Sequence, residues 1–176
     1  MSSHEHPIIE QAVIRLIITI AIYCSSLDIN LKMTLILSID FVKNSYFYIR
    51  DRQQLGNLAK NSVYQDWDKT VDTFTYFLVF RLAQQVKWLS KGELDLLFVS
   101  LFVRSIGTCL MFKNRDYLAY FPDLFKEILF VLYLRNVNKI SDASTVVVSV
   151  VFILFKIYSE YNLHINKKSL SNLFDI

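Results

Sequence analysis

Apolar residues recur along the whole chain in segments of roughly 20 residues, separated by short polar stretches. At about 1.5 Å rise per residue, helices of that length match the thickness of a bilayer core. The pattern predicts an all-α fold, a polytopic transmembrane bundle of about six helices in a single membrane domain, 1–176. The predicted helices are 7–24, 31–50, 70–90, 93–113, 117–135 and 142–162, with a loop at 51–67 and a tail at 163–176.

The alternative is a soluble helical bundle whose charged stripes face water. The longest runs without a charge, 16–27 and 143–155, fall short of an uncharged span of roughly 18 residues or more. Against the soluble alternative, the segments 7–24, 93–113 and 142–162 lack a polar face wide enough for a surface helix. We therefore expect a membrane protein in which 117–135 is the weakest span, because an acid–base cluster lies at its centre.

Every predicted helix carries an ionisable residue away from its ends. Within a bilayer such residues face the bundle interior and pair with one another. The acidic residues of the second and fifth helices share a helix face with their basic neighbours, and we expect them to pair with arginines of the third and fourth helices. The intramembrane charges expected to be paired are Arg15, Asp40, Lys43, Arg81, Arg104, Asp123, Lys126, Glu127 and Lys156.

The distribution of Lys and Arg predicts an orientation in the membrane. Eight basic residues lie in segments on the side of the N-terminus and five on the opposite side. We therefore expect an integral membrane protein with both termini on the same, cytoplasm-like side. No basic leader with a cleavage site is apparent, so the first helix is expected to remain as an anchor.

Composition narrows the functional classes. Hydrophobic residues make up 53% of the chain and charged residues 20%, which is not the composition of a disordered protein. Three Gly and two Cys provide neither a Gly-rich phosphate loop nor a cysteine metal site. A net charge of +3 does not indicate nucleic-acid binding. The abundance of Phe, Tyr, Ile, Leu, Lys and Asn is typical of an AT-rich genome, which indicates an organellar, protist or large-virus source.

Three carboxylates around the 51–67 loop are the candidate chemistry of the chain. Asp40 lies late in the second predicted helix, and Asp68 and Asp72 stand one turn apart at the start of the third. Clustered carboxylates can hold Mg²⁺, and basic residues in the loop could attract a phosphate-bearing substrate. In that arrangement a further Asp could deprotonate an attacking hydroxyl group.

This stretch resembles the signature of the CDP-alcohol phosphatidyltransferase family, six-helix membrane enzymes whose motif is Asp-x2-Asp-Gly-x2-Ala-Arg, eight residues, then Gly-x3-Asp-x3-Asp. The resemblance implies that Asp40 and Asp68 are ligands of Mg²⁺ and that Asp72 is the general base. The second Asp of the motif is Lys43 here, and the spacing between the two halves is longer. The resemblance therefore also allows an inactive relative of these enzymes, a pseudoenzyme.

The same residues have a reading without any ligand. Asp40 then pairs with Lys43 or with a neighbouring Arg. Asp66 and Asp68 would cap the N-terminus of the third helix, where negative charge is favourable. On this reading no cofactor is expected.

Three functional hypotheses remain open. The preferred one is a non-catalytic integral membrane protein, a structural or accessory subunit of a larger assembly such as a viral inner membrane or an organellar complex. Its partners would be the bilayer and other membrane or capsid subunits, or a second copy in a homodimer. The second hypothesis is the CDP-alcohol phosphatidyltransferase-like lipid enzyme. The third is an anion-conducting component lined by Arg15, Arg81, Arg104 and Lys156.

Overall fold

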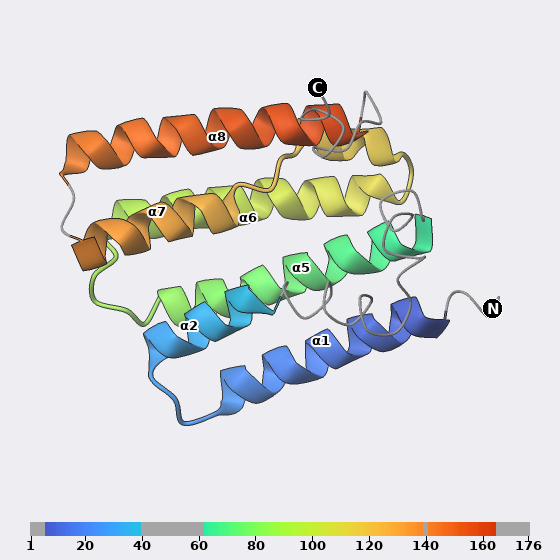
Figure 1. The fold of residues 1–176 in the computed structure, drawn as a ribbon, viewed down its shortest axis with the longest axis horizontal. Coiled ribbons are helices and arrows are strands. Elements are labelled where there is room, and N and C mark those ends of the chain that lie inside the picture. Colours follow the sequence, from blue (N-terminus) through green and yellow to red (C-terminus); the bar gives the residue numbers. More distant parts are fainter. Residues whose placement is uncertain (1–5, 40–61, 139–140, 165–176) are drawn as a thin grey trace, which may run out of the picture. The chain divides into compact units, whose positions relative to one another are not determined.

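The computed structural model describes residues 6–39, 62–138 and 141–164, and all regular structure among them is helical (Figure 1). The all-α prediction is therefore confirmed. The chain divides into two compact units, Met1–Val86 and Lys87–Ile176, and the single membrane domain stays a prediction. The helices are α1 (His6–Cys24), α2 (Ile29–Ser38), α5 (Ser62–Ala83), α6 (Lys91–Met111), the 3-10 helix η2 (Arg115–Tyr120), α7 (Phe125–Asn138) and α8 (Asp142–His164).

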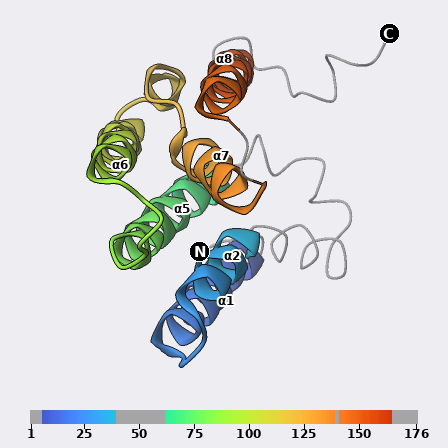
Figure 2. The same ribbon diagram turned by 90° about the vertical axis from the view of Figure 1, so that its left-hand side faces the viewer.

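In the first unit, α1, α2 and α5 pack against one another (Figures 1 and 2). A short turn separates α1 from α2, and Asp28 ends it by accepting hydrogen bonds from the backbone N–H groups of Asn30 (2.8 Å) and Leu31 (3.3 Å). These bonds satisfy donors that the first turn of a helix cannot pair internally. The buried apolar residues of the three helices include Ile8, Ala12, Met33, Ile36, Val71, Tyr76 and Val79.

The second unit begins with a well-defined helix start. Ser90 and Glu93 form a capping box, in which the Ser90 hydroxyl accepts from the Glu93 N–H (3.4 Å) and the Glu93 carboxylate accepts from the Ser90 N–H (2.7 Å). Helix α6 then packs against η2 and α7, and α8 packs against η2 and α7. The core of this unit includes Leu97, Leu101, Leu118, Phe125, Leu129 and Val131.

The prediction of a single helix over 117–135 is wrong. The structure has η2 up to Tyr120, a break, and α7 from Phe125. The cause is Pro122, which disfavours the helical conformation of the residue before it. Phe121 accordingly has φ −125° and ψ 66°. Asp123 therefore lies outside α7 rather than on the same helix face as Glu127.

The boundaries between the second and third predicted helices also differ. Helix α5 covers 62–83 rather than 70–90, so residues 62–67 are helical and not part of the predicted loop. The prediction that Asp66 and Asp68 cap this helix is wrong, because both lie inside it. Of the predicted helix 31–50, the part up to residue 38 is observed, and residues 40–50, with Asp40 and Lys43, lie outside the described residues.

Two helices of the described residues are long and apolar enough to cross a membrane, by length and composition. They are α6 over Lys91–Met111 and α8 over Asp142–Asn162. Their surroundings within the chain differ, since 39% of the α6 window is buried but only 6% of the α8 window. Most of α8 therefore presents its apolar side chains outward.

Candidate functional site

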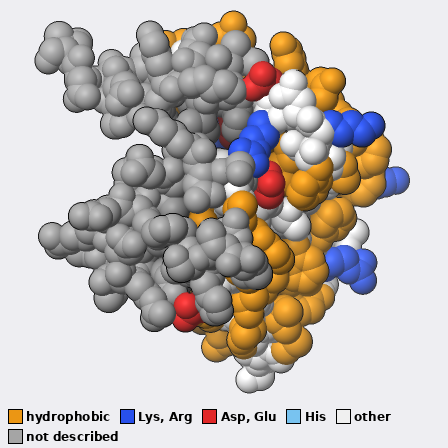
Figure 3. Space-filling view, turned by 90° about the vertical axis from the view of Figure 1, so that its right-hand side faces the viewer, with side chains coloured by type: hydrophobic (Ala, Val, Ile, Leu, Met, Phe, Trp, Pro, Cys, Tyr) orange, Lys and Arg blue, Asp and Glu red, His pale blue; other side chains and the backbone are white. Residues whose placement is uncertain are grey.

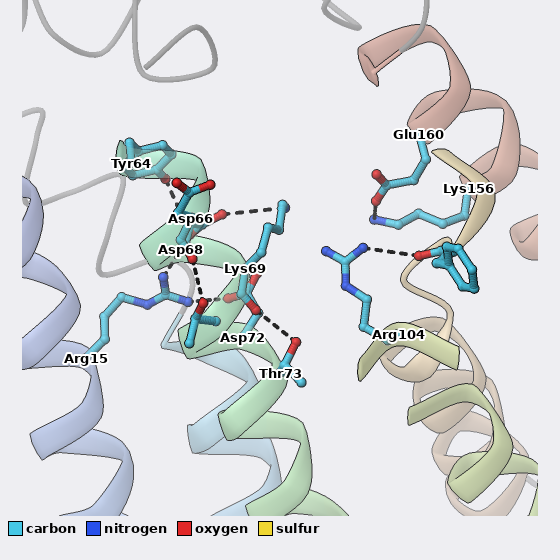
Figure 4. Close-up of polar contacts among 12 residues, drawn as sticks. Arg15, Tyr64, Asp66, Asp68, Lys69, Asp72, Thr73, Arg104, Lys156 and Glu160 are labelled. Carbon is cyan, nitrogen blue, oxygen red and sulfur yellow. Dashed lines mark hydrogen bonds and ion pairs between the residues drawn. The ribbon is translucent and has the colours of Figure 1, made fainter. Parts of the chain in front are cut away.

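A buried ionic contact between α1 and α5 is the centre of the first unit. Arg15 lies on the face of α1 that also carries the buried Ile8 and Ala12, and this face is directed toward α5. Its guanidinium donates from Nη1 to Oδ1 of Asp68 (2.9 Å) and from Nη2 to Oδ1 of Asp72 (2.5 Å). Figure 4 shows Arg15 directed between the two carboxylates. One guanidinium thus bonds to two acids that stand one turn apart.

Further polar groups surround the same two acids. Lys69 Nζ lies 3.5 Å from Oδ2 of Asp68, and the Tyr64 hydroxyl donates to Oδ1 of Asp68 at 3.5 Å (Figure 4). Within this group of described residues, two cations therefore balance two carboxylates. That balance matters because an uncompensated charge in a buried position costs several kcal/mol.

The polar face of α1 extends one turn on either side of Arg15. Gln11 and Thr19 are both buried and stand four residues before and after it. Neither Gln11 Nε2 nor Thr19 Oγ1 has a hydrogen-bond partner among the described residues. Helix α1 thus directs polar groups inward along at least two turns while Ile17 and Ile20 are exposed.

The sequence placed Asp68 and Asp72 on one helix face, and the structure confirms that placement. It also identifies their common partner, Arg15, which the sequence had left unassigned. Within the described residues, no group of three or more His, Cys, Asp or Glu side chains is arranged to hold a metal ion. Because Asp40 lies outside those residues, the predicted magnesium site with Asp40 and Asp68 as ligands and Asp72 as base stays a prediction.

A second ionic cluster, in which Glu160 is buried and Lys156 and Glu127 are half-buried, occupies the second unit. Lys156 of α8 lies between two glutamates, with Nζ 3.6 Å from Oε1 of Glu127 on α7 and 3.4 Å from Oε1 of Glu160 on its own helix. Arg104 of α6 donates to the backbone carbonyl of Phe121 (3.3 Å; Figure 4). Arg104, Asp123 and Glu160 are all buried. The Lys156–Glu127 pair joins α7 to α8, and the Arg104 bond joins α6 to the segment after η2.

Other charges that the sequence singled out lie elsewhere. Arg81 is exposed and donates to Oε1 of Gln84 (3.0 Å), so the expectation that an acidic helix face holds it is wrong. Lys126 is half-buried in the first turn of α7. Sequence reasoning missed the ion pair of Arg135 with Glu93 (2.5 Å), which joins α7 to the start of α6. The Ser-x-x-Glu capping signal at 90–93 could have drawn attention to Glu93.

Comparison of this chain with protein-family models, with curated proteins and with solved structures finds no match. The resemblance to the CDP-alcohol phosphatidyltransferases therefore rests on the short motif alone. The function has to be inferred from the chain's own residues, their burial and their contacts.

Proposed function

We propose that the protein is a non-catalytic integral membrane protein, a structural or accessory subunit of a larger membrane assembly. The observation that supports this most is that two arginines are buried while many large apolar side chains are exposed. Arg15 and Arg104 are only 1% and 0% exposed, whereas Val147 and Leu154 are 63% and 62% exposed. In water the opposite arrangement is favourable, because charged groups need solvation and apolar groups avoid it.

Helix α8 shows the reversal most clearly. Its buried residues include polar ones, Thr145, Glu160 and Asn162, while the apolar side chains cover most of its circumference. The exposed apolar residues on it are Val146, Val147, Val150, Val151, Phe152, Leu154, Phe155, Ile157, Tyr158 and Tyr161. A soluble helix carries the reverse pattern, so a lipid environment fits this helix better than water does.

Other surfaces support the same environment. The outward positions of α6 include Leu96, Phe98, Val99 and Phe102, and Phe98 stacks on Phe102 with ring centroids 6.4 Å apart. On the face shown in Figure 3, the described side chains are mostly hydrophobic, with few charged ones between them. Apolar patches of this extent mark contacts with lipid or with protein partners.

The buried charges fit a structural role in the bilayer. Among the described residues, Arg15 of α1 pairs with Asp68 and Asp72 of α5, and Lys156 of α8 pairs with Glu127 of α7 and with Glu160 of its own helix. Charges in membrane helices are tolerated when they pair in this way. The same pairing disfavours an anion pathway, because two of its four proposed basic residues are bound to acids and Arg81 is exposed. Both termini on one side, and a viral inner membrane or an organellar complex as location, are part of the proposal.

One substitution tests the membrane environment of α8. Val151 is exposed near the middle of the candidate span, so Val151→Lys should cost about 2.5–3.5 kcal/mol of insertion free energy. In a soluble bundle the same exposed substitution would change stability by less than about 0.5 kcal/mol. Ala143→Lys at the helix start is the matched control, since a lysine there reaches the membrane surface.

Two assays are applied to the full chain in native-like membranes. Carbonate extraction of one sample shows whether the chain is integrated, and protease protection of a C-terminal tag in sealed vesicles of another shows its orientation. We expect the wild type and Ala143→Lys to resist extraction and to show the tag on one side, whereas Val151→Lys loses that uniform orientation. Complete extraction of the wild type, or equal behaviour of both variants, would overturn the membrane proposal. The structural role is tested separately by the mass of the particle extracted gently from its source. A fixed assembly supports that role, and a lone monomer contradicts it.

The lipid-enzyme alternative is favoured by one observation, the position of Asp68 and Asp72 on the same face of α5. On that alternative Mg²⁺ would be the cofactor and Asp72 the base. It predicts release of CMP from a CDP-linked lipid that requires Mg²⁺ and disappears in Asp72→Asn. Arg81→Leu serves as the control, because Arg81 is exposed on the same helix. Absence of CMP release from the membrane-inserted wild type would remove this alternative.

A further inference from the structure

Polar side chains of α1 line its contact with α5 over several turns. Gln11, Arg15 and Thr19 follow one another at intervals of four residues and are 3%, 1% and 0% exposed. On the opposite face of the same helix, Val13 and Ile17 are exposed. Helix α1 therefore turns polar residues toward the interior of the first unit and apolar residues away from it.

Helix α5 carries a matching row of polar residues. A set of its buried polar side chains recurs every three or four positions, which places them on one face of the helix. They are Gln65, Asp68, Asp72 and Thr75. The rows of the two helices face each other, because the Arg15 guanidinium donates to Asp68 (2.9 Å) and to Asp72 (2.5 Å) at their centre (Figure 4). We call the two facing rows the polar seam.

The bonds at the centre of the polar seam also place its two ends. Helices α1 and α5 run in the same direction (Figure 1), and both rise about 1.5 Å per residue. Arg15 bonds to the acids at its own level, so Gln11, one turn before it, lies near the level of Gln65. By the same count Thr19, one turn after it, lies near the level of Thr75. Each end of the seam therefore brings polar residues of two helices to one level.

The α1 residue at each end of the polar seam has a buried polar atom without a partner. Neither Gln11 Nε2 nor Thr19 Oγ1 has a hydrogen-bond partner among the described residues. Thr73, by contrast, is a buried threonine of the same unit that donates to the Lys69 carbonyl (2.9 Å). A buried polar group without a hydrogen bond is unfavourable whether water or lipid surrounds the protein. The two atoms therefore indicate a small ligand that can bond both to an amide and to a hydroxyl.

We propose that the polar seam binds water molecules at Gln11 Nε2 and at Thr19 Oγ1, on either side of Arg15 and its two acids. Water both donates and accepts hydrogen bonds, and a buried water molecule bonds to about three polar groups of the protein. Polar side chains of α1 and α5 at the same level supply such groups at each end. Water beside the ionic cluster also lowers the cost of burying its charges. The inference concerns the first unit alone and does not depend on the membrane proposal.

The test is solid-state NMR of the isotope-labelled full chain, in which magnetisation passes from water protons to the protein during short mixing times. The sample is the chain in lipid bilayers, or the sedimented protein if the chain is soluble. Thr108 is the internal control, because it is a buried threonine that donates to the Arg104 carbonyl (3.0 Å). Thr108 is 6% exposed and Thr19 is 0% exposed, so a signal at Thr19 alone cannot come from water outside the protein.

In the wild type we expect transfer from water to the Thr19 side chain and to the Gln11 amide, and none to Thr108. Thr19→Val keeps the shape of the side chain and should abolish transfer at position 19 without changing the transfer at Gln11. Thr19→Ser keeps the hydroxyl and should retain both signals. If either variant fails to fold, the wild-type spectrum alone decides.

Three results would overturn the inference. The first is an absence of transfer to both Thr19 and Gln11 in the wild type. The second is transfer to Thr108 as strong as to Thr19. The third is a direct contact of Gln11 Nε2 and Thr19 Oγ1 with other residues of the chain, without water between them.

Discussion

Replacement of Arg15 by leucine is the most informative perturbation of the first unit. Arg15 is 1% exposed and donates to Asp68 at 2.9 Å and Asp72 at 2.5 Å. Removing it leaves two carboxylates buried one turn apart, and among the described residues Lys69 is the remaining cation in contact with Asp68. Loss of one side of a buried ion pair costs about 3–5 kcal/mol, so Arg15→Leu should lower the free energy of unfolding by that amount.

This loss of stability would come from burying two acids without Arg15, and it does not require the ion pairs themselves to contribute much to the stability of the wild type. The triple variant Arg15→Leu with Asp68→Asn and Asp72→Asn has no buried charge at these positions, and should therefore recover most of the lost stability. The assay is reversible unfolding of the purified protein in mixed detergent micelles, followed by circular dichroism. Arg81→Leu is the control, since its side chain is exposed and should change the free energy by less than about 0.5 kcal/mol. The reasoning is refuted if Arg15→Leu equals Arg81→Leu, or if the triple variant is no more stable than Arg15→Leu.

Three further substitutions test the packing of the second unit by thermal unfolding. Gly107→Ala should destabilise by about 1–3 kcal/mol, because its methyl group would overlap Phe121, and an unchanged midpoint would contradict the close approach. A Cβ at Gly92 would meet no atom within 4 Å, so Gly92→Ala should be neutral or stabilising by up to about 1 kcal/mol. If Gly92→Ala destabilised as much as Gly107→Ala, the loss at Gly107 could not be assigned to the contact with Phe121. Ser90→Ala removes the acceptor of the Glu93 N–H and should cost about 1 kcal/mol, whereas no loss would mean that the cap does not stabilise α6.

The helical segments themselves could be predicted from sequence with good positions. The observed α1, α6 and α8 lie within two residues of the predicted 7–24, 93–113 and 142–162. Their long apolar runs are a local property that can be recognised from the sequence alone. Where the prediction failed, at 117–135, the apolar run continued through Pro122 and concealed the local break that this residue imposes.

The start of α5 was a different kind of failure. Residues 62–69 are rich in polar side chains, and their apolar periodicity is too weak to predict a helix. Tyr64 and Asp68 nevertheless turn inward with Val71, because Arg15 on α1 supplies a buried partner. The first turns of α5, which the sequence did not predict, thus contact another helix, and the local sequence gives no sign of that contact.

The sequence by itself determined the helical class, the approximate positions of α1, α6 and α8, and the fact that charged residues interrupt apolar helices. It also determined that Asp68 and Asp72 share a face, since four residues make about one turn of any α-helix. Only the tertiary structure decided which charges meet. Arg15 bonds to acids 53 and 57 positions away, a choice that depends on how α1 packs on α5. Helix periodicity acts over a few residues, whereas an ion pair between helices requires two distant segments to present their charges at the same level.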